Sequence, residues 1–262
     1  MKKTLPGEID TITSLPHYNL SFITGIDSMA VHYHHCYKVV VALDNVFDCN
    51  IDGQTLLRIR GIIINLTTTH SYVGADTNTL ISFIEADSLL GRQFKIILDG
   101  KAYVNLENVV PSESIIAVLP ANYTELGNDV LVPYIDSFLN SLLSTASQET
   151  NLIMDERVQI ALQYIEENIH KTLELKDIAN QINLSPERLR RLFVQEVGTL
   201  FSQYVIWMRI RKTIKVAMIE ENKFNEACLR FGFTDQPHFN KTFKRIFGLT
   251  PVGIIRYCRV VL

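Results

Sequence analysis

Three side chains that can recognise a base pair stand at helical spacing in the second half of the chain. Glu187, Arg190 and Arg191 are three and four residues apart, so on a helix they share one face. A guanidinium can donate two parallel hydrogen bonds to a guanine edge, and a carboxylate can accept from a cytosine amino group. This combination is typical of a helix that enters the major groove of DNA.

A second polar face follows closer to the C-terminus, in the segment Gly232–Gly248, GFTDQPHFNKTFKRIFG. Asn240, Lys241 and Lys244 lie between the apolar residues of this segment, and Arg245 follows them. Such side chains can hold phosphate oxygens or base edges. The chain therefore offers two surfaces suited to nucleic acid.

Each polar face needs a helix to position it, and the sequence contains the start and stop signals. Ser185 can cap a helix that has Pro186 as its first residue and ends at Gly198. The buried side of this helix is predicted to consist of Leu189, Leu192, Phe193 and Val197. In the second segment Thr234 or Asp235 can act as the cap, and Gly232 ends the helix before it. Its buried side is predicted to consist of Phe239, Phe243, Ile246 and Phe247.

One long helix is predicted between the two polar faces. Residues Phe201–Glu220 contain no Gly or Pro, and their apolar residues recur at helical spacing. At about 1.5 Å per residue this helix is roughly 30 Å long, which is close to the ~34 Å between successive major-groove segments on one side of B-DNA. Two reading helices on this spacer are expected to fit adjacent turns.

These features together form a recognisable pattern. The residues that carry it are Leu175, Ile178, Ala179, Ser185, Leu189, Arg191, Phe193, Gly198, Tyr204, Arg209, Gly232, Phe233, Asp235, Phe239, Phe243, Lys244, Gly248, Thr250 and Pro251. Residues 155–257 thereby resemble the DNA-binding domain of the AraC/XylS transcriptional regulators. The resemblance implies a sequence-specific regulator with two helix-turn-helix motifs. The DNA contacts that it implies are Ser185, Glu187, Arg188, Arg190, Arg191, Gln236, His238, Asn240, Lys241, Lys244 and Arg245.

The second motif departs from the family in places. Pro237 and His238 stand where polar residues such as Ser or Gln are common, and Val252 and Gly253 replace a polar helix start after Thr-Pro. These departures imply a second reading helix that is weaker or mainly directed to phosphates. They also leave open an alternative, a regulator that acts mainly through protein partners.

The N-terminal part changes to a period of two. Short runs rich in β-branched and aromatic residues are separated by turn signals such as Asp44-Asn45 and Asp52-Gly53, which favours a β-sandwich or small barrel. The predicted strands are 18–24, 29–33, 37–43, 46–51, 54–60, 61–66 and 80–85. Residues 18–90 resemble the cupin-like sensor domain of many AraC-type regulators. The resemblance implies a cavity for a small-molecule effector, with candidate contacts at His34, Tyr37, Arg60 and His70.

Three histidines raise the question of a metal. His32, His34 and His70 could together hold Zn²⁺ or another divalent ion. The metal-binding cupins add a glutamate several residues after the His-x-His pair, whereas here Lys38 lies in that neighbourhood and would repel a cation. We therefore expect no metal and no other cofactor, and favour histidines that line an effector cavity or are satisfied at strand ends. Strand alternation predicts that His35 is exposed.

Charge is distributed unevenly although the net charge is only −3. Residues 1–151 hold 8 Lys and Arg against 16 Asp and Glu, whereas residues 152–262 hold 17 against 12. The basic half suits contact with phosphates, and the acidic half argues against it. The four cysteines show no metal-ligand spacing and no apolar run reaches ~18 residues, so we expect a cytoplasmic protein with reduced thiols and no membrane contact.

The domain organisation follows from these changes in pattern. We expect a sensor domain at 1–90, a helical dimerisation or packing segment and linker at 91–147, and the DNA-binding domain at 152–262. In the middle segment Val132, Ile135, Phe138, Leu139 and Leu142 form an apolar stripe. The family resemblance implies that a helix here pairs with its twin in a homodimer. The polar run 144–151 is the predicted linker.

Catalytic motifs are missing from the sequence. It contains no Gly-rich phosphate loop, no GxSxG motif and no HExxH motif, so we expect no catalytic residues and no enzymatic activity. A metal-dependent cupin enzyme fused to a DNA-binding domain remains the enzymatic alternative. Double-stranded DNA, a small-molecule effector and RNA polymerase are the expected partners of the preferred function.

Overall fold

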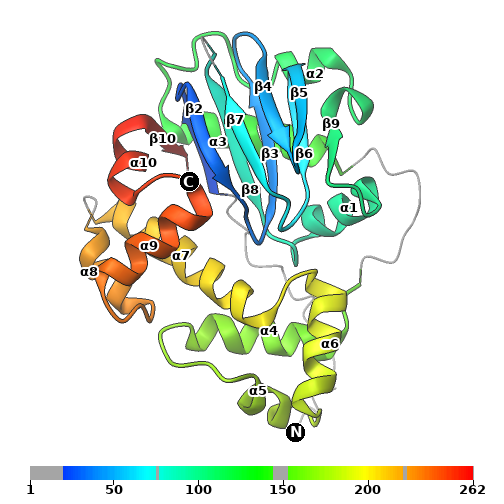
Figure 1. Ribbon diagram of the computed structural model, residues 1–262, viewed down its shortest axis with the longest axis vertical. Coiled ribbons are helices and arrows are strands. Elements are labelled where there is room, and N and C mark those ends of the chain that lie inside the picture. The colour runs from blue at the N-terminus through cyan, green and yellow to red at the C-terminus, as the bar shows by residue number, and fades with distance from the viewer. Residues whose placement is uncertain (1–19, 75–76, 144–152, 221–222, 262) are drawn as a thin grey trace, which may run out of the picture.

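A computed structural model describes residues 20–74, 77–143, 153–220 and 223–261. The first two residues of the strand expected at 18–24 and the predicted linker at 144–151 lie outside these ranges. Figure 1 shows a β-rich part at the top and helices wrapped below and beside it.

Two antiparallel sheets form the N-terminal part. The six-stranded sheet has the order β10-β1-β8-β3-β6-β9, and the four-stranded sheet has the order β2-β7-β4-β5. The strands are β1 Leu20–Thr24, β2 Ser28–His32, β3 Tyr37–Ala42, β4 Phe47–Ile51, β5 Gln54–Ile59, β6 Gly61–Ile64, β7 His70–Val73, β8 Thr79–Ile84, β9 Tyr103–Asn105 and β10 Cys258–Val261. The prediction of a mainly β N-terminal domain is confirmed. Strands β7 and β9 are not among the predicted strands.

The centre of the larger sheet is apolar on both faces. Every residue of β3 and β8 is buried, since these strands lie between neighbours and have one face toward the smaller sheet and the other toward helices. Helix α1, Leu89–Leu98, covers part of the outer face, where the rings of Tyr37 and Phe94 meet edge to face at 5.9 Å. The short elements η1 Leu106–Asn108 and α2 Ser112–Ile116 lead to α3, Asn128–Ser141, which lies behind the sheet in Figure 1.

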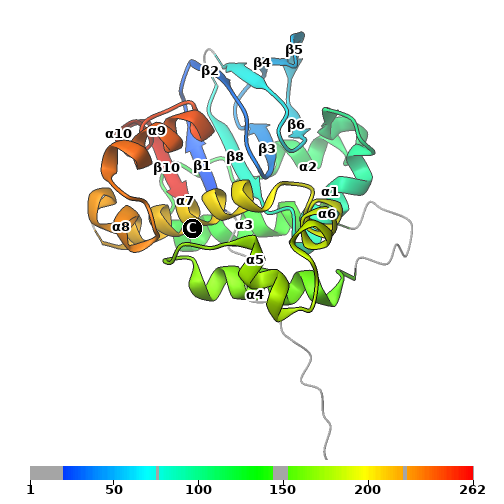
Figure 2. The ribbon, with the colours of Figure 1, turned by 60° about the horizontal axis from the view of Figure 1, so that its bottom comes forward.

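The predicted C-terminal helices are present. They are α4 Glu156–Asn168, α5 Leu175–Gln181, α6 Pro186–Val197, α7 Phe201–Ile219, α8 Phe224–Arg230, α9 Gln236–Phe247 and α10 Pro251–Tyr257. Helices α5 and α6 form the first helix-turn-helix unit, and α8 and α9 form the second. The long helix α7 joins them, and it lies between the sheets and α4 in both views (Figures 1 and 2).

The chain ends in a strand, which the prediction of an all-helical C-terminal part did not include. Strand β10 pairs antiparallel with β1, so that Ser21 lies opposite Val261 and Thr24 opposite Cys258. Arg259 strengthens this junction by donating hydrogen bonds to the Asn128 side chain at 2.9 Å and to the backbone oxygens of Tyr123 and Leu126. The second helix-turn-helix unit is therefore fastened to the sensor sheet.

Helix α7 makes a second junction with the sensor part. Arg211 forms an ion pair with Glu85, just after β8, and the Tyr204 hydroxyl donates to Asp87 at 3.1 Å. The side chains of Glu85 and Arg211 are only 7% and 19% exposed. This desolvated pair joins the larger sheet to the middle of the C-terminal helical part.

None of the described helices is both long and apolar enough to cross a membrane. The four cysteines are free, and three of them are buried.

Candidate nucleic-acid interface and sensor cavity

Helix α6 is held in one orientation by its cap and its apolar side. The Ser185 hydroxyl accepts from the backbone N–H of Arg188 at 3.3 Å, and Gly198 ends the helix with a left-handed φ of 79°. The predicted buried residues Leu189, Phe193 and Val197 are fully packed, and Leu192 is half-buried. The opposite face is therefore turned to solvent.

The predicted contact residues of α6 are all on that solvent face. Ser185, Glu187, Arg188, Arg190 and Arg191 are exposed. Arg190 forms an ion pair with Glu187, and both side chains are more than half exposed, at 56% and 59%. An exposed pair of this kind contributes little stability, so Arg190 can exchange Glu187 for a base edge at small cost.

Helix α9 repeats this construction. Asp235 is the cap, since its carboxylate accepts from the His238 N–H at 2.7 Å, and Gly248 ends the helix with φ 70°. The predicted apolar side, Phe239, Phe243, Ile246 and Phe247, is buried. Of the predicted contact residues, Asn240 is half-buried, and the exposed ones are Gln236, His238, Lys241, Lys244 and Arg245.

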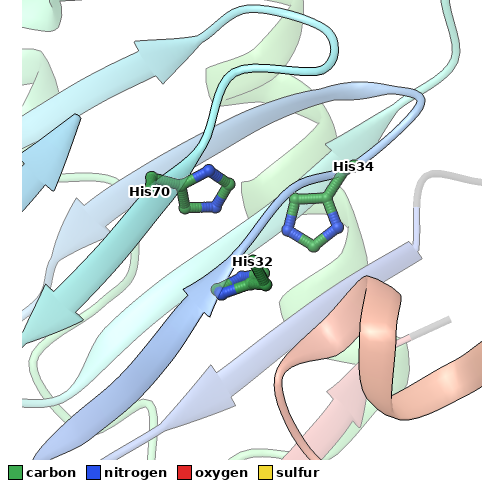
Figure 3. A group of neighbouring side chains, drawn as sticks. All are labelled: His32, His34 and His70. Atoms are coloured by element: carbon green, nitrogen blue, oxygen red, sulfur yellow. The ribbon is translucent and has the colours of Figure 1, made fainter. Parts of the chain in front are cut away.

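The sensor part contains a buried histidine cluster, drawn in Figure 3. The ring centroids of His32, His34 and His70 are 4.4 to 5.1 Å apart. His32 Nδ1 lies 2.7 Å from the Ala30 carbonyl and His70 Nδ1 lies 2.9 Å from the Thr68 carbonyl. A carbonyl can only accept, so each Nδ1 carries the proton and each Nε2 has a free lone pair.

Lys38 lies within this cluster. Its Nζ is 3.2 Å from His70 Nε2 and donates to that lone pair. Burial lowers the pKa of Lys38 to about 8. Burial, helped by the nearby Lys38, lowers the pKa of His32 to about 3, and burial lowers the pKa of His34 and His70 well below the usual value. At neutral pH the imidazoles are therefore neutral and the positive charge resides on Lys38.

The cluster is a poor fit for a metal ion as it stands. The ligand nitrogens of His32, His34 and His70 all lie within 4.8 Å of one another, and three imidazoles suit a divalent ion such as Zn²⁺. However, Lys38 places a protonated amine on one of the lone pairs that the ion would need. Because like charges repel, the lysine and a divalent cation compete for this site. The expected absence of a metal stays a prediction.

The structure brings together only two of the four predicted effector contacts. His34 and His70 face each other in the cluster. Tyr37 precedes Lys38 on β3 and points to the opposite face, where it packs on α1. Arg60 precedes Gly61, and Gly61 pairs with Val41 of β3. Val41 lies three residues from Lys38 along the strand, which corresponds to roughly 10 Å. Tyr37 and Arg60 thus lie outside the histidine cluster, and the effector role of all four residues stays a prediction.

Sequence reasoning missed one residue of this site and misplaced another. His32 is among the histidines expected to line an effector cavity, whereas Lys38 is predicted only as a charge that repels a metal ion. A lone lysine among the apolar residues of YKVVVA is the signal that could have identified Lys38. His35 is buried instead of exposed, with 5% of its surface accessible, because it lies in the turn between β2 and β3, where strand alternation does not apply.

A narrow cavity adjoins the cluster where the sensor meets the second helix-turn-helix unit. Its volume of about 10 Å³ corresponds to roughly one water molecule. Apolar side chains from both parts line it together with His32 and Lys38: Phe22, Met29, Ile81, Phe83, Phe247, Leu249, Ile254 and Cys258. Phe247, the last residue of α9, contacts Phe22, Phe83 and His34 with centroid distances of 5.9, 5.2 and 6.0 Å.

Comparison with known proteins agrees with this architecture. Residues 178–256 match the family model HTH_18, described as a helix-turn-helix domain. The probable transcriptional regulator LumQ of Photobacterium leiognathi is 21% identical over 86% of this chain and 92% of its own length. The HTH-type regulator YpdC of Escherichia coli K12 is 32% identical, but the match spans only 34% of this chain and 31% of that protein.

Solved structures extend the similarity to both domains. An apo structure of a ToxT variant from Vibrio cholerae matches with a TM-score of 0.60 at 13% identity, over 91% of this chain and 97% of that one. A ToxT structure described as bound to an unsaturated fatty acid matches with a TM-score of 0.53 at 13% identity, over 89% and 94% of the two chains. At this identity the match establishes the fold alone. The helix-turn-helix match and the regulators similar in sequence identify this chain as a DNA-binding transcriptional regulator that carries an AraC-type helix-turn-helix domain after a mainly β N-terminal domain.

Proposed function

We propose that this regulator reads two successive major-groove segments, with α6 in one and α9 in the next. The observation that carries the proposal is that the two helices are built alike. Each has 12 residues, a side-chain cap, a proline in its first turn and a left-handed glycine at its end. At about 1.5 Å per residue, the 19 residues of α7 span roughly 29 Å, and this length supports a spacing of the two readers close to one helical turn of DNA.

The roles of the contact residues follow from their chemistry. Arg190 and Arg191 would donate to guanine edges, and Glu187 would accept from a cytosine amino group or exclude a base. Lys241, Lys244 and the neighbouring Arg245 would hold phosphates or base edges. The exposure of these side chains supports this division of roles.

The test of the two-reader proposal is selection of genomic or random DNA fragments by the purified protein at near-physiological salt. Sequencing of the bound fragments is expected to show two elements about one helical turn apart. Salt-sensitive binding without any enriched sequence would leave only phosphate attraction. Together with a stable complex with another protein, that result would favour a regulator that acts through protein partners.

We further propose that the cavity between the sensor and α9 receives the effector, a small and largely apolar molecule with an acidic group. The apolar lining suits the body of such a molecule, and Lys38 supplies a buried positive charge. The ToxT structure with a bound unsaturated fatty acid shows that a similar fold can accept a molecule of this class. Because the cavity is no larger than one water, entry must displace Phe247 or its neighbours and so shift α9.

The effector proposal can be tested by thermal melting and calorimetry with a long unsaturated fatty acid and with its methyl ester. The acid is expected to stabilise the wild-type protein, and the ester and the Lys38→Met variant are expected to show little effect. Lys101→Met removes an exposed lysine and serves as the control. Equal binding of acid and ester, or equal binding by Lys38→Met, would refute the charge partnership. No binding at all would refute the effector class and leave DNA reading intact.

A homodimer, contact with RNA polymerase, a cytoplasmic location and the absence of enzymatic activity belong to the same proposal. Helix α3 buries Leu131, Ile135, Phe138 and Leu139 against the rest of the chain and leaves Val130 and Tyr134 39% and 45% exposed. These two side chains are the candidate dimer contacts. Sedimentation of the wild type and of Tyr134→Glu tests this: a dimer that dissociates in the variant supports it, and a wild-type monomer refutes it.

A further inference from the structure

Arg209 lies in the middle of α7 and contacts backbone from both halves of the DNA-binding domain. Its Nε donates to the Ile169 carbonyl at 3.2 Å, and its Nη2 donates to the Lys171 carbonyl at 2.6 Å. Its Nη1 donates to the Gly232 carbonyl at 3.0 Å. Residues 169 and 171 connect α4 to the first helix-turn-helix unit, whereas Gly232 lies in the turn between α8 and α9.

The turn of the second unit is shaped to receive this side chain. Gly232 has a left-handed φ of +82°, which most other residues adopt only with strain. A Cβ atom added at this position would lie 2.9 Å from the guanidinium carbon of Arg209 and 3.0 Å from Nη2. The glycine thus permits both the sharp turn and the close approach of the arginine.

The guanidinium suits three separate carbonyls in a way that an amine does not. It is planar, always charged, and presents five N–H donors in a fixed fork. Hydrogen bonds from a charged donor are shorter and stronger than neutral ones. A lysine has the same charge but a single nitrogen, so it cannot reach acceptors that diverge to both sides of α7.

Aromatic contacts hold α6 at the start of α7 and the end of α9 against Trp207 in the first half of α7, where the ring centroids of Trp207 and Phe247 are 6.1 Å apart. Phe193 of α6 packs on Phe201 and Tyr204 near the start of α7, with centroid distances of 5.9 and 5.6 Å. These ring contacts restrain where each reading helix lies along α7. Arg209 adds hydrogen bonds to both units at once, and such a side chain can restrict the rotation of one unit about the α7 axis relative to the other.

We propose that Arg209 is a positioning residue that sets the relative orientation of α6 and α9, and hence the spacing of the two DNA elements that the protein selects. The second half of this inference rests on the proposed two-reader function. The first half concerns the protein without DNA and can be tested separately.

The DNA-free test measures the distance between the two units by electron spin resonance of paired spin labels. The labels are attached at Gln181→Cys on α5 and Glu226→Cys on α8, both exposed positions, with the partly accessible Cys258 changed to Ser. A narrow distribution of distances is expected for Arg209, and a broader or shifted one for both Arg209→Lys and Arg209→Gln.

The DNA test uses the selected two-element sequence with base pairs inserted between the elements. In the wild type the second element is expected to raise affinity about 100-fold at the matched spacing and to lose this gain when half a helical turn is inserted. In both Arg209 variants the ratio of the affinity at the matched spacing to the affinity with half a turn inserted is expected to shrink to about tenfold. Binding to a single element should be unchanged. Lys212→Gln is the control. It removes a positive charge about one helical turn after Arg209, where Lys212 pairs with the exposed Glu166, and this variant should keep the wild-type preference for the matched spacing.

Unchanged label distances in both variants would overturn the inference, whatever the DNA result. Wild-type behaviour of Arg209→Lys would show that only charge matters. Loss of cooperative unfolding in both variants would make Arg209 a folding residue and would equally refute a positioning role. If DNA selection finds no second element, the two-reader function fails while the label distances still decide the structural claim.

Discussion

At the scale of single residues, this protein uses positive charge in two different environments. Arg191 is exposed on α6, where a guanidinium keeps its hydration until it meets DNA. Lys38 is 2% exposed and faces neutral histidines, an arrangement that costs desolvation and raises the affinity of the site for an anion. The first charge suits recognition of a large polyanion, and the second suits a single buried acidic group.

Replacement of Arg191 by Ala should weaken binding to the selected DNA by about 1–3 kcal/mol and relax the preference at one base pair. Competition assays with every base substituted at each position provide the measurement. Arg230→Ala is the control. It removes an exposed positive charge at the end of α8 that is paired with Glu220 and is not among the predicted DNA contacts. An equal loss on all sequences would assign Arg191 to a phosphate.

Replacement of Lys38 by Glu should convert the histidine cluster into a metal site. The change removes the competing cation and adds a carboxylate beside three imidazoles, a ligand set that suits Zn²⁺ or Co²⁺. Visible absorption of tetrahedral Co²⁺ is expected in the variant and not in the wild type. The double variant Lys38→Glu, His70→Gln should lose the Co²⁺ absorption again. Tight Co²⁺ binding by the wild type would show that Lys38 does not keep metal ions out of the cluster.

Acid should destabilise the protein through its buried histidines. Burial lowers the pKa of His32 to about 3 and, with the charge of Arg245, that of His35 to about 4, while an unfolded histidine titrates near 6.5. The stability that these histidines contribute is therefore fully present above pH 6.5. It is lost as the pH falls from 6.5 toward the folded pKa values, because in this range the unfolded chain binds protons and the folded protein does not. The free energy of unfolding should fall by up to about 1.4 kcal/mol per pH unit for each such histidine.

Urea unfolding between pH 7 and pH 5 measures this effect. The His35→Gln variant should show a shallower dependence on pH, and the exposed His170→Gln should keep the wild-type slope. A midpoint independent of pH in the wild type would contradict the neutral state assigned to the cluster.

At the scale of elements, the caps of α6 and α9 determine which face each helix presents. A cap fixes the first turn, and the apolar stripe then leaves the polar residues outside. The left-handed glycines at 198 and 248 end both helices. At Gly248 an added Cβ would lie 3.3 Å from the His32 ring, so this helix end also abuts the sensor cluster. The same element therefore carries proposed DNA contacts and adjoins the proposed effector cavity.

Loss of the α9 cap should destabilise the second unit. Asp235→Ala removes the acceptor of the His238 N–H and should lower the free energy of unfolding by about 1 kcal/mol, whereas Asp235→Asn retains an acceptor and should lose less. Ser185→Ala is the matched change in α6. Thr234→Ala removes the hydroxyl that donates to Asp235 at 3.2 Å but keeps the capping carboxylate, so it should lose less than Asp235→Ala. Equal losses for Asp235→Ala and Asp235→Asn would show that the carboxylate acts through charge and not through the cap.

At the scale of the whole molecule, the sensor and the DNA-binding domain share one continuous core. Strand β10 extends the sensor sheet, Phe247 packs among sensor aromatics, and Arg211 pairs with Glu85. Under the proposed function, a change in the cavity would reach α9 through the direct contact of Phe247. Such coupling requires that an effector bind one arrangement of the two domains more tightly than another. The cavity is too small to hold an effector while Phe247 keeps its present packing, so a bound effector would favour an arrangement in which Phe247 has moved.

Removal of residues 258–262 should loosen the second unit from the sensor. Loss of β10 exposes the edge of β1, so faster amide exchange is expected in β1, α9 and α10, with little change in α6. Arg259→Ala should show the same pattern more weakly, and Arg256→Ala, an exposed change on α10, should show none. Unchanged exchange in β1 of the truncated protein would refute the role of β10 as a fastening.

The sequence by itself determined the reading helices and their solvent faces. Caps, periodic apolar residues and terminal glycines act within a few positions of one another, so Ser185, Gly198, Asp235 and Gly248 indicate both helices without knowledge of the fold. Only the tertiary structure decided the sensor site and the link between domains. Lys38 meets His70 from 32 residues away, and β10 pairs with β1 across nearly the whole chain. Such contacts depend on which strands become neighbours and on the face that each side chain takes, and neither is encoded in local spacing.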